Sequence, residues 1–132
     1  MIVPLQESNY TSAYRLFQTA FDMSENHTFK QAWTVRSRSL SFGYWVNAKL
    51  IGVAIVCGHR LHYIYIDERY RSKGFGSELL QTILAHSPTL HLTPVDNPKI
   101  HEWYVQHGFR LSQIRGAYRL YVHHDHDLRS IH

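Results

Sequence analysis

The sequence predicts a mixed α/β domain with a central sheet of about seven strands, and three features lead to this prediction. Two β-rich runs, 40–46 and 50–57, flank a short polar turn and are typical of a hairpin. Within 61–95 an apolar strand, a glycine-rich turn, an amphipathic helix and a further strand follow one another, which favours parallel neighbours joined by a right-handed crossover. Two more apolar runs, 109–114 and 117–122, predict a final pair of strands.

The other elements follow from caps, breakers and periodicity. Residues 1–5 predict an edge strand, where a proline is tolerated. Ser8 or Asn9 can cap a helix that continues to about Phe21, and a weaker second helix follows Ser24. The remaining predicted elements are the strand 61–66, a helix from Gly76 to just before Pro88, the strand 89–95, and a helix from Pro98 to Gly108.

Length and composition favour one compact intracellular domain. A chain of 132 residues with 44% hydrophobic content can bury roughly two thirds of its unfolded surface in one core, so we expect a single domain over 1–132. Cys57 is the sole cysteine, which excludes an internal disulfide and favours a reducing compartment. The sequence shows neither a leader-like segment nor an apolar run of about 18 residues, so the expected location is the cytoplasm.

The formal net charge of +4, from 14 basic and 10 acidic residues, favours an anionic ligand without identifying it. A nucleic-acid-binding face would need a dense Lys/Arg surface with interleaved aromatic rings. The nearest approach is Arg36 and Arg38 with Trp33 and Tyr44, which we interpret as an ordinary solvated face. Neither a nucleic acid nor a membrane is therefore expected as a partner.

The turn after the strand 61–66 has the composition of a phosphate-binding loop. Gly74 and Gly76 allow a tight turn without Cβ clashes, and the start of the next helix adds free backbone N–H donors and the positive end of its dipole. Glycines at such a turn can also serve geometry alone, and the loop by itself leaves that alternative open. A dinucleotide fingerprint would need glycine where Leu79 stands, and the P-loop pattern does not occur. The basic residues around the loop are Arg69, Arg71 and Lys73.

Two stretches, Arg71-Ser-Lys-Gly74-Phe-Gly76 and the segment 97–109 with Asn97, Tyr104, Gly108 and Phe109, together resemble the GNAT superfamily of N-acyltransferases. The loop Arg71-Ser-Lys-Gly74-Phe-Gly76 matches the family's acyl-CoA loop, Arg/Gln-x-x-Gly-x-Gly/Ala. The family's second pattern, Asn-x-x-Ala-x-x-x-Tyr-x-x-x-Gly-Phe, is met by Asn97, Tyr104, Gly108 and Phe109. The chain departs from this pattern at Ile100, where a small residue is usual. The resemblance covers about 40–109 and implies a GNAT-like fold, with a mixed sheet of about seven strands, splayed fourth and fifth strands and about four flanking helices.

This resemblance implies an acetyl-CoA-dependent N-acetyltransferase that transfers an acetyl group to a primary amine by direct attack in a ternary complex. The alternative is a non-catalytic acyl-CoA-binding module of the same fold, because Arg60 replaces the glutamate that many relatives carry on the fourth strand. A route through an acetylated cysteine is not favoured, since Cys57 lies within a predicted strand. The sequence does not specify whether the acceptor is a small molecule or a peptide, and a homodimer is compatible with it.

The resemblance also implies cofactor-binding residues. In the family, the pantetheine arm lies between the splayed strands and bonds to their edges, while the diphosphate lies on the amides of the loop. Asn97 is fully explained as a helix cap before Pro98, so a cofactor contact would be an additional role. The positions carried over are Ile64 and Ile66 on the fourth strand, a segment near Thr93 on the fifth, the loop residues Arg71, Ser72, Lys73, Gly74, Phe75, Gly76 and Ser77, and Asn97 and Tyr104 on the last helix.

Catalytic roles follow from the same resemblance. The N–H of Ile64 would donate to the developing oxyanion and Tyr104 would protonate the leaving thiolate, although periodicity explains Tyr104 equally as a core aromatic. His62 would accept the amine's proton directly or through water. It matches the second histidine of a His-x-His pair in arylalkylamine acetyltransferases, and strand parity places it with Ile64 and Ile66. With 11 histidines in the chain, a bystander role for His62 stays open, and His59 is a weaker candidate for the base.

The tail His123-His124-Asp125-His126-Asp127 invites a metal-binding interpretation. It has no distant partner at a recognisable ligand spacing, so we interpret it as a solvated terminus. The catalytic scheme needs no metal, and no metal site is predicted.

Overall fold

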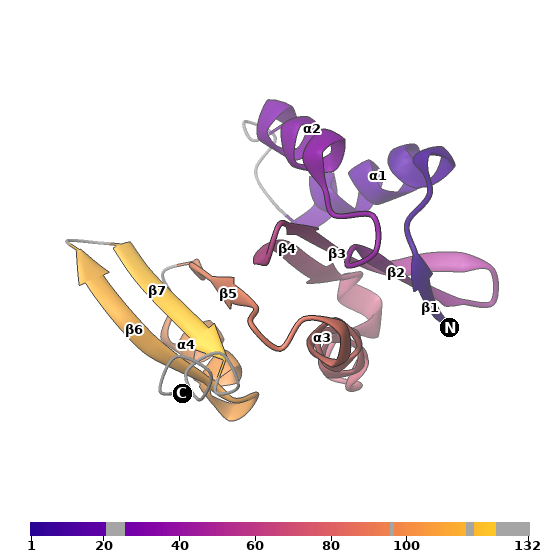
Figure 1. The fold of residues 1–132 in the computed structure, drawn as a ribbon. Coiled ribbons are helices and arrows are strands. Elements are labelled where there is room, and N and C mark those ends of the chain that lie inside the picture. The colour runs from indigo at the N-terminus through magenta and orange to yellow at the C-terminus, as the bar shows by residue number, and fades with distance from the viewer. Residues whose placement is uncertain (21–25, 96, 116–117, 124–132) are drawn as a thin grey trace.

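The computed structural model describes residues 1–20, 26–95, 97–115 and 118–123, and Figure 1 shows how its elements are arranged. The elements labelled η are single turns of 3-10 helix. In chain order the elements are β1 (Ile2–Pro4), η1 (Glu7–Asn9), α1 (Tyr10–Ala20), α2 (Asn26–Val35), β2 (Phe42–Val46), β3 (Lys49–Cys57), β4 (Arg60–Ile66), η3 (Glu68–Tyr70), α3 (Phe75–His86), β5 (His91–Leu92), α4 (Pro98–Gln106), β6 (Phe109–Arg115) and β7 (Tyr118–His123).

The described residues form one seven-stranded sheet in the order β1-β2-β3-β4-β5-β7-β6. Its neighbouring strands are antiparallel except β4 and β5, which run parallel because the chain crosses over through α3 between them. Helices α1 and α2 cover one face of the β2–β4 half of the sheet and α3 covers the other (Figure 1), while α4 packs against β6. The predicted mixed seven-stranded fold is thus confirmed.

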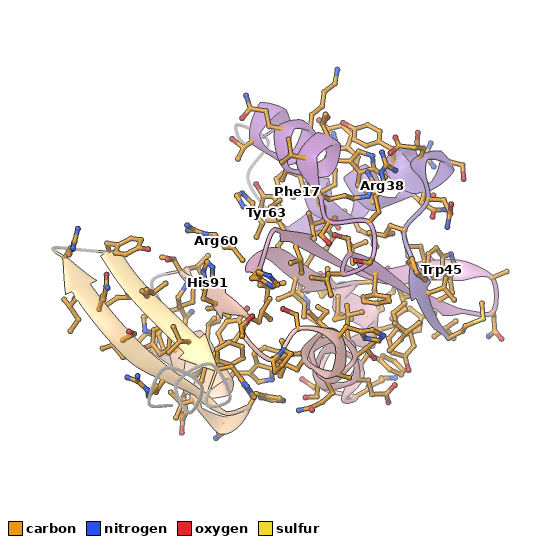
Figure 2. All side chains as sticks on the ribbon, in the orientation of Figure 1. Phe17, Arg38, Trp45, Arg60, Tyr63 and His91 are labelled. Atoms are coloured by element: carbon orange, nitrogen blue, oxygen red, sulfur yellow. The ribbon has the colours of Figure 1, made fainter. Side chains whose placement is uncertain are left out.

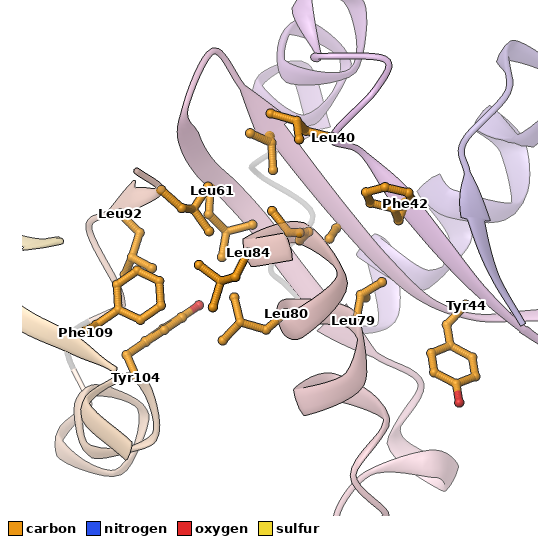
Figure 3. Packing of buried hydrophobic residues seen from close by; sticks show 14 of the residues in the cluster. Leu40, Phe42, Tyr44, Leu61, Leu79, Leu80, Leu84, Leu92, Tyr104 and Phe109 are labelled. Atoms are coloured by element: carbon orange, nitrogen blue, oxygen red, sulfur yellow. The ribbon is translucent and has the colours of Figure 1, made fainter. Parts of the chain in front are cut away.

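Two apolar clusters, one on each face of the sheet, hold the helices in place. On the α3 face, Leu79, Leu80 and Ile83 are fully buried against residues of β2, β3 and β4 (Figure 3). On the opposite face, Phe17 of α1 and Phe29 of α2 are fully buried, with ring centroids 4.7 Å apart. Strand β3 contributes to both clusters, which explains why its sequence is a nearly continuous apolar run instead of an alternating one.

Two element boundaries differ from the sequence prediction for physical reasons. The strand predicted over 89–95 is reduced to His91–Leu92, because beyond these residues the chain pairs with neither neighbouring strand and Pro94 has no N–H to donate. The helix expected from Gly76 begins one residue earlier, at Phe75, because Gly74 is its cap. For the first helix, the predicted end at Phe21 lies outside the described residues.

Arg36 belongs to the core, so the predicted solvated basic face is wrong. The residue is 5% exposed, and Trp33 and Tyr44 are buried as well. The Arg36 guanidinium lies 4.1 Å from the Trp33 ring centroid, donates to the Trp33 carbonyl at 2.8 Å and forms an ion pair with Glu7 at 3.0 Å. Arg38 is exposed and pairs with the same Glu7 oxygen at 2.9 Å. These contacts compensate the burial of the Arg36 charge and join η1 to the end of α2.

We expect this ion pair to contribute to acid sensitivity. Hydrogen bonds from Arg36 and then Arg38 lower the pKa of the Glu7 carboxyl from its ordinary value of 4.5. The resulting stabilisation is fully present above that ordinary value and disappears as the pH falls through the lowered pKa. Glu7→Gln should therefore lower the Tm at pH 7, and the difference from the wild type should shrink below about pH 4. Thermal unfolding followed by circular dichroism at several pH values measures both effects.

Glu102→Gln provides the matched control, because Glu102 is exposed on α4 and makes no ion pair with the described residues. Equal melting temperatures for the two variants at pH 7 would contradict a stabilising role of the Glu7 ion pair.

Candidate functional site

The loop between β4 and α3 presents a run of free backbone amides. Ser72 and Gly74 adopt positive φ angles of 62° and 86°, which turn the chain sharply into α3. The first helical bond of α3 runs from the Glu78 N–H to the Gly74 carbonyl at 3.1 Å. Within the described part of the chain, the N–H groups of residues 72–77 have no hydrogen-bond partner. They surround the positive end of the α3 dipole, an arrangement suited to a phosphate group.

Contacts at the end of β4 hold this loop in position. The Asp67 N–H donates to the Ile51 carbonyl at 2.7 Å, and its carboxylate accepts from the Arg69 N–H at 3.1 Å. That backbone hydrogen bond, followed by the charges of Arg69 and Lys49, lowers the pKa of Asp67. Arg71 Nε donates to the Ile66 carbonyl at 2.9 Å, so its terminal nitrogens are left to meet an anion.

Strands β4 and β5 meet at one end and then part. Among the described residues they pair at a single position, Arg60 with His91, where the His91 N–H donates to the His59 carbonyl at 3.0 Å. Figure 2 shows the Arg60 and His91 side chains at this junction. Asp67 bonds to β3, so the alternation of an antiparallel ladder turns the N–H groups of Ile64 and Ile66 away from β3 and towards the separated β5.

A buried polar atom lies on the β5 side of this separation. The hydroxyl oxygen of Thr93, which directly follows β5, is inaccessible to solvent and has no hydrogen-bond partner in the described structure. A buried hydroxyl without a partner is unfavourable. The Thr93 hydroxyl after β5 and the N–H groups on the edge of β4 are therefore polar groups without a partner strand at this separation in the described structure.

The side chain of Tyr104 projects from α4 towards α3. The residue is 7% exposed, and its ring contacts Trp103 and Phe109 at centroid distances of 5.0 and 5.6 Å. Figure 3 shows its hydroxyl pointing towards Leu80 and Leu84 of α3. In the described structure this hydroxyl has no hydrogen-bond partner, and burial raises its pKa. The phenol is therefore protonated at neutral pH and available as a donor, in addition to being the core aromatic that periodicity alone predicts.

A bulge in the β3–β4 ladder changes the surroundings of His62. The register shifts opposite Ile55 and Val56, so that they pair with Tyr63 and Leu61 and leave His62 as an extra residue. Simple strand parity therefore does not place its side chain. His62 is exposed and its ring lies 4.9 Å from that of Tyr63. Desolvation of the imidazole, whose ring contacts that of Tyr63, and then the charge of Arg60 lower its pKa, so the imidazole is neutral at physiological pH.

The other sequence candidates take structural positions. Asn97 caps α4, accepting from the Lys99 N–H at 2.9 Å. His59 lies in the β3–β4 turn with its Nδ1 3.1 Å from the Ser87 hydroxyl. Burial raises the pKa of the Cys57 thiol, which disfavours a thiolate. The described residues contain no cluster of three or more metal-ligating side chains. Of the His-rich tail, 124–127 lie outside them.

Two contacts at the first turn of α3 were missed by the sequence analysis. The Tyr44 hydroxyl donates to Glu78 Oε2 at 2.5 Å, a bond that raises the pKa of Tyr44 to about 12 and ties β2 to α3. The Ser77 hydroxyl lies 2.8 Å from His107 Nε2 and so connects α3 to α4. No local pattern around His107 identifies the element that it meets.

A basic cleft of about 650 Å³ lies on the α1 side of the loop. It is formed by α1, the β2–β3 turn and the residues that follow β4. Its charged lining residues are Arg15, Lys49, Arg69 and Arg71 together with Asp67 and Glu68. Cations outnumber carboxylates here, so the field around the loop favours an anionic ligand.

The family model of the acetyltransferase (GNAT) domain matches residues 38–111, more than half of the chain. The chain belongs to the GNAT acetyltransferases. It is thus an acyl-CoA-dependent N-acetyltransferase, and the loop, the parted strands and Tyr104 all lie within the matched range. No curated protein matches the chain by sequence. No helix in the described ranges is both long and apolar enough to cross a membrane.

Solved GNAT structures resemble the whole fold. The ribosomal-protein-S18-alanine N-acetyltransferase from Escherichia coli is 25% identical, with a TM-score of 0.74 over 92% of this chain and 90% of that one. Naa50 from Arabidopsis thaliana, in complex with the bisubstrate analogue CoA-Ac-MVNAL, is 14% identical, with a TM-score of 0.77 over 92% and 95%. The PaiA N-acetyltransferase from Thermoplasma acidophilum, in complex with coenzyme A, is 16% identical, with a TM-score of 0.72 over 93% and 97%.

The loop conformation can be tested by a pair of glycine substitutions. Gly74 has a φ of +86° and a Cβ added there would meet nothing within 4 Å. Gly74→Ala should therefore cost only the strain of the left-handed backbone, about 1–2 kcal/mol, and should weaken coenzyme A binding by shifting the loop amides. Chemical denaturation and calorimetric titration measure the two effects.

Gly58→Ala is the control, because Gly58 also has a positive φ of 63° and open space around its Cβ, but lies in the β3–β4 turn. It should lower stability to a similar extent without changing coenzyme A affinity. Equal losses of affinity in both variants would show that the loop conformation has no specific role.

Proposed function

We propose that this protein transfers the acetyl group of acetyl-CoA to a primary amine by direct attack within a ternary complex. The observation that supports this most directly is the run of unpartnered amides at 72–77 next to the separated edge of β4. Phosphate and pantetheine groups would satisfy these two sets of backbone donors together.

The residues present fit coenzyme A in detail. The amides of residues 72–77 would hold the diphosphate, with Arg71 and Lys73 supplying positive charge. The Arg71 N–H is excluded from this set because it already donates to the Glu68 carbonyl at 3.3 Å. The pantetheine arm would bond to the edge groups of Ile64 and Ile66 and to the Thr93 hydroxyl, with Asn97 at the end of this path.

The chemistry requires a donor for the oxyanion and an acid for the thiolate. The N–H of Ile64, turned away from β3, would donate to the thioester oxygen as negative charge develops on it. The buried phenol of Tyr104 would give its proton to the departing sulfur. Its raised pKa ensures that the proton is present before the reaction.

His62 is the proposed base. Its lowered pKa keeps it neutral, so that it can take the ammonium proton directly or through a water molecule. The position at which many relatives carry a glutamate is occupied here by Arg60, which cannot accept a proton. Arg60 also lies at the junction with β5, where its charge disfavours a protonated His62 before the amine arrives.

The acceptor class that we propose first is the α-amine of a peptide. The E. coli structure at 25% identity is an alanine N-acetyltransferase for a ribosomal protein, and the Naa50 complex contains a peptide-derived bisubstrate analogue. On the α1/α2 face, the half-buried ring of Tyr63 lies 5.3 Å from Phe17, next to Ile64 in sequence (Figure 2). The Tyr63 ring, supported from behind by the buried Phe17, would form an apolar wall for the first residue of a peptide.

Substitution of the acid separates catalysis from binding. Tyr104→Phe should lower kcat by about a hundredfold, the lower end of what acid catalysis supplies, while changing the coenzyme A Kd by no more than about twofold. Thiol release with a peptide acceptor measures kcat, and calorimetry measures Kd. Tyr65→Phe is the control, because it removes another buried hydroxyl, which donates to the Ala13 carbonyl on the opposite face.

The alternative suggested by Arg60, a non-catalytic acyl-CoA-binding module, is not supported by the family match, but it makes a distinct prediction. It predicts tight coenzyme A binding with no thiol release on peptide, small-molecule or aromatic amines. Such a result for the wild-type protein would refute the transferase proposal.

The pH dependence of kcat tests the base. His62 must be neutral to accept a proton, so kcat should fall only when the pH drops through a value below 6.5, because the pKa of His62 is lowered from that figure. His62→Gln should lower kcat by about a hundredfold at pH 7 and remove this acidic limb. His59→Gln is the comparison, and if it removes the limb instead, the assignment of the base is wrong.

A further inference from the structure

The histidine that caps the C-terminal end of α4 is hydrogen-bonded to a hydroxyl at the proposed diphosphate site. His107 Nε2 lies 2.8 Å from the Ser77 hydroxyl, and Nδ1 lies 2.7 Å from the Trp103 carbonyl. The His107 and Trp103 ring centroids lie 4.3 Å apart with the ring planes tilted by 39°, and a Cβ on Gly76 would lie 3.7 Å from the Trp103 ring. The imidazole is therefore held against the first turn of α3, where the free amides lie.

The two contacts determine which way the Ser77 hydroxyl donates when His107 is neutral. A carbonyl oxygen can only accept, so Nδ1 must carry the ring proton. Neutral imidazole has one N–H, which leaves a lone pair on Nε2. The Ser77 hydroxyl must then donate its single proton to Nε2 and presents lone pairs to its remaining surroundings.

Lone pairs are unfavourable for a diphosphate, whose oxygens need donors. Turning the Ser77 hydroxyl towards the phosphate would leave the half-buried Nε2 of His107 without a partner, a loss worth roughly tenfold in affinity. If His107 instead gains a proton, Nε2–H donates to the Ser77 oxygen and the hydroxyl proton becomes free for the phosphate. The imidazolium also adds a positive charge close to the anion.

We infer that coenzyme A binding is coupled to protonation of His107, which acts through Ser77 as a positioning residue for the diphosphate. This inference rests on the proposed cofactor site. The proton is taken from solvent, the Nε2–H bond forms as the ligand binds, and no covalent bond of the ligand changes. Affinity should therefore increase as the pH falls, because the complex holds more protons than the free components.

The groups that face His107 permit this proton uptake. Ser77 faces it from α3 and Trp103 from its own helix. From β7, the His123 ring approaches the adjacent Gly108, since a Cβ on Gly108 would lie 2.9 Å from His123 Nε2. At the start of β6, Arg110 is the nearest basic residue along the chain. No carboxylate among the described residues contacts the His107 ring, so the incoming diphosphate is the anion that would stabilise its charge.

The test is calorimetric titration with dephospho-coenzyme A at pH 7 in two buffers of different ionisation enthalpy. This ligand keeps the diphosphate but lacks the 3′-phosphate, whose own titration near pH 6 would otherwise contribute. The wild-type protein should take up a fraction of one proton per ligand bound. Its Kd should rise from pH 6 to pH 8 by at most about tenfold per pH unit, the limit for one coupled proton.

Three variants identify the source of the proton. His107→Gln should abolish the uptake and flatten the pH dependence of Kd, because it removes the group that gains the proton. Ser77→Ala should weaken both effects, because only the attraction between the imidazolium and the diphosphate then remains. His86→Gln is the matched control: His86 also bonds to a backbone carbonyl, that of Thr82 at 2.9 Å, but lies in the last turn of α3. It should retain the wild-type uptake.

The outcomes are distinguishable. Binding by the wild type without proton uptake, or uptake that persists in His107→Gln, overturns the coupling and leaves the proposed function intact. Absence of any binding of coenzyme A or its dephospho form overturns the proposed function together with the coupling. The wild-type measurement alone is decisive should a variant fail to fold.

Discussion

The arrangement of the site depends on β4 and β5 being joined at one end and separated at the other. The Arg60–His91 pair joins them, and β5 is held on its far side through the pairing of Leu92 with Tyr121 of β7. Because β5 is so short, the N–H groups of Ile64 and Ile66 lie inside the sheet without a neighbouring strand. Backbone groups in such a position need a partner, and an extended ligand can supply it as a strand would.

The first turn of α3 is the second fixed point of the structure, and three elements secure it. The end of β4 holds the preceding loop through Asp67 and Arg71, β2 holds Glu78 through Tyr44, and α4 holds Ser77 through His107. A rigid support is needed because a row of amides binds an anion well only when it does not have to be reorganised. The same contacts place Tyr104 of α4 opposite α3, so the proposed binding loop and the proposed acid share one support.

Local signals in the sequence predicted much of this site. The glycine spacing predicted the loop and the helix that follows, and Asn97 before Pro98 predicted the capped start of α4. These predictions succeed because they rest on backbone requirements of neighbouring residues, such as a positive φ at Gly74. Parity failed to place His62, because a bulge inserts one residue into β4, and nothing within a single strand reveals the register of its partner.

By itself, the sequence determined the order of the strands and helices, the family to which the chain belongs and the position of the phosphate-type loop. Only the tertiary structure decided that Arg36 is buried against Trp33, that β5 shrinks to its pairing residues, and that Ser77 meets His107 across 30 positions of the chain. The physical reason is the range of the interactions: turns and caps depend on adjacent residues, whereas burial, strand pairing and contacts between helices depend on how distant segments pack.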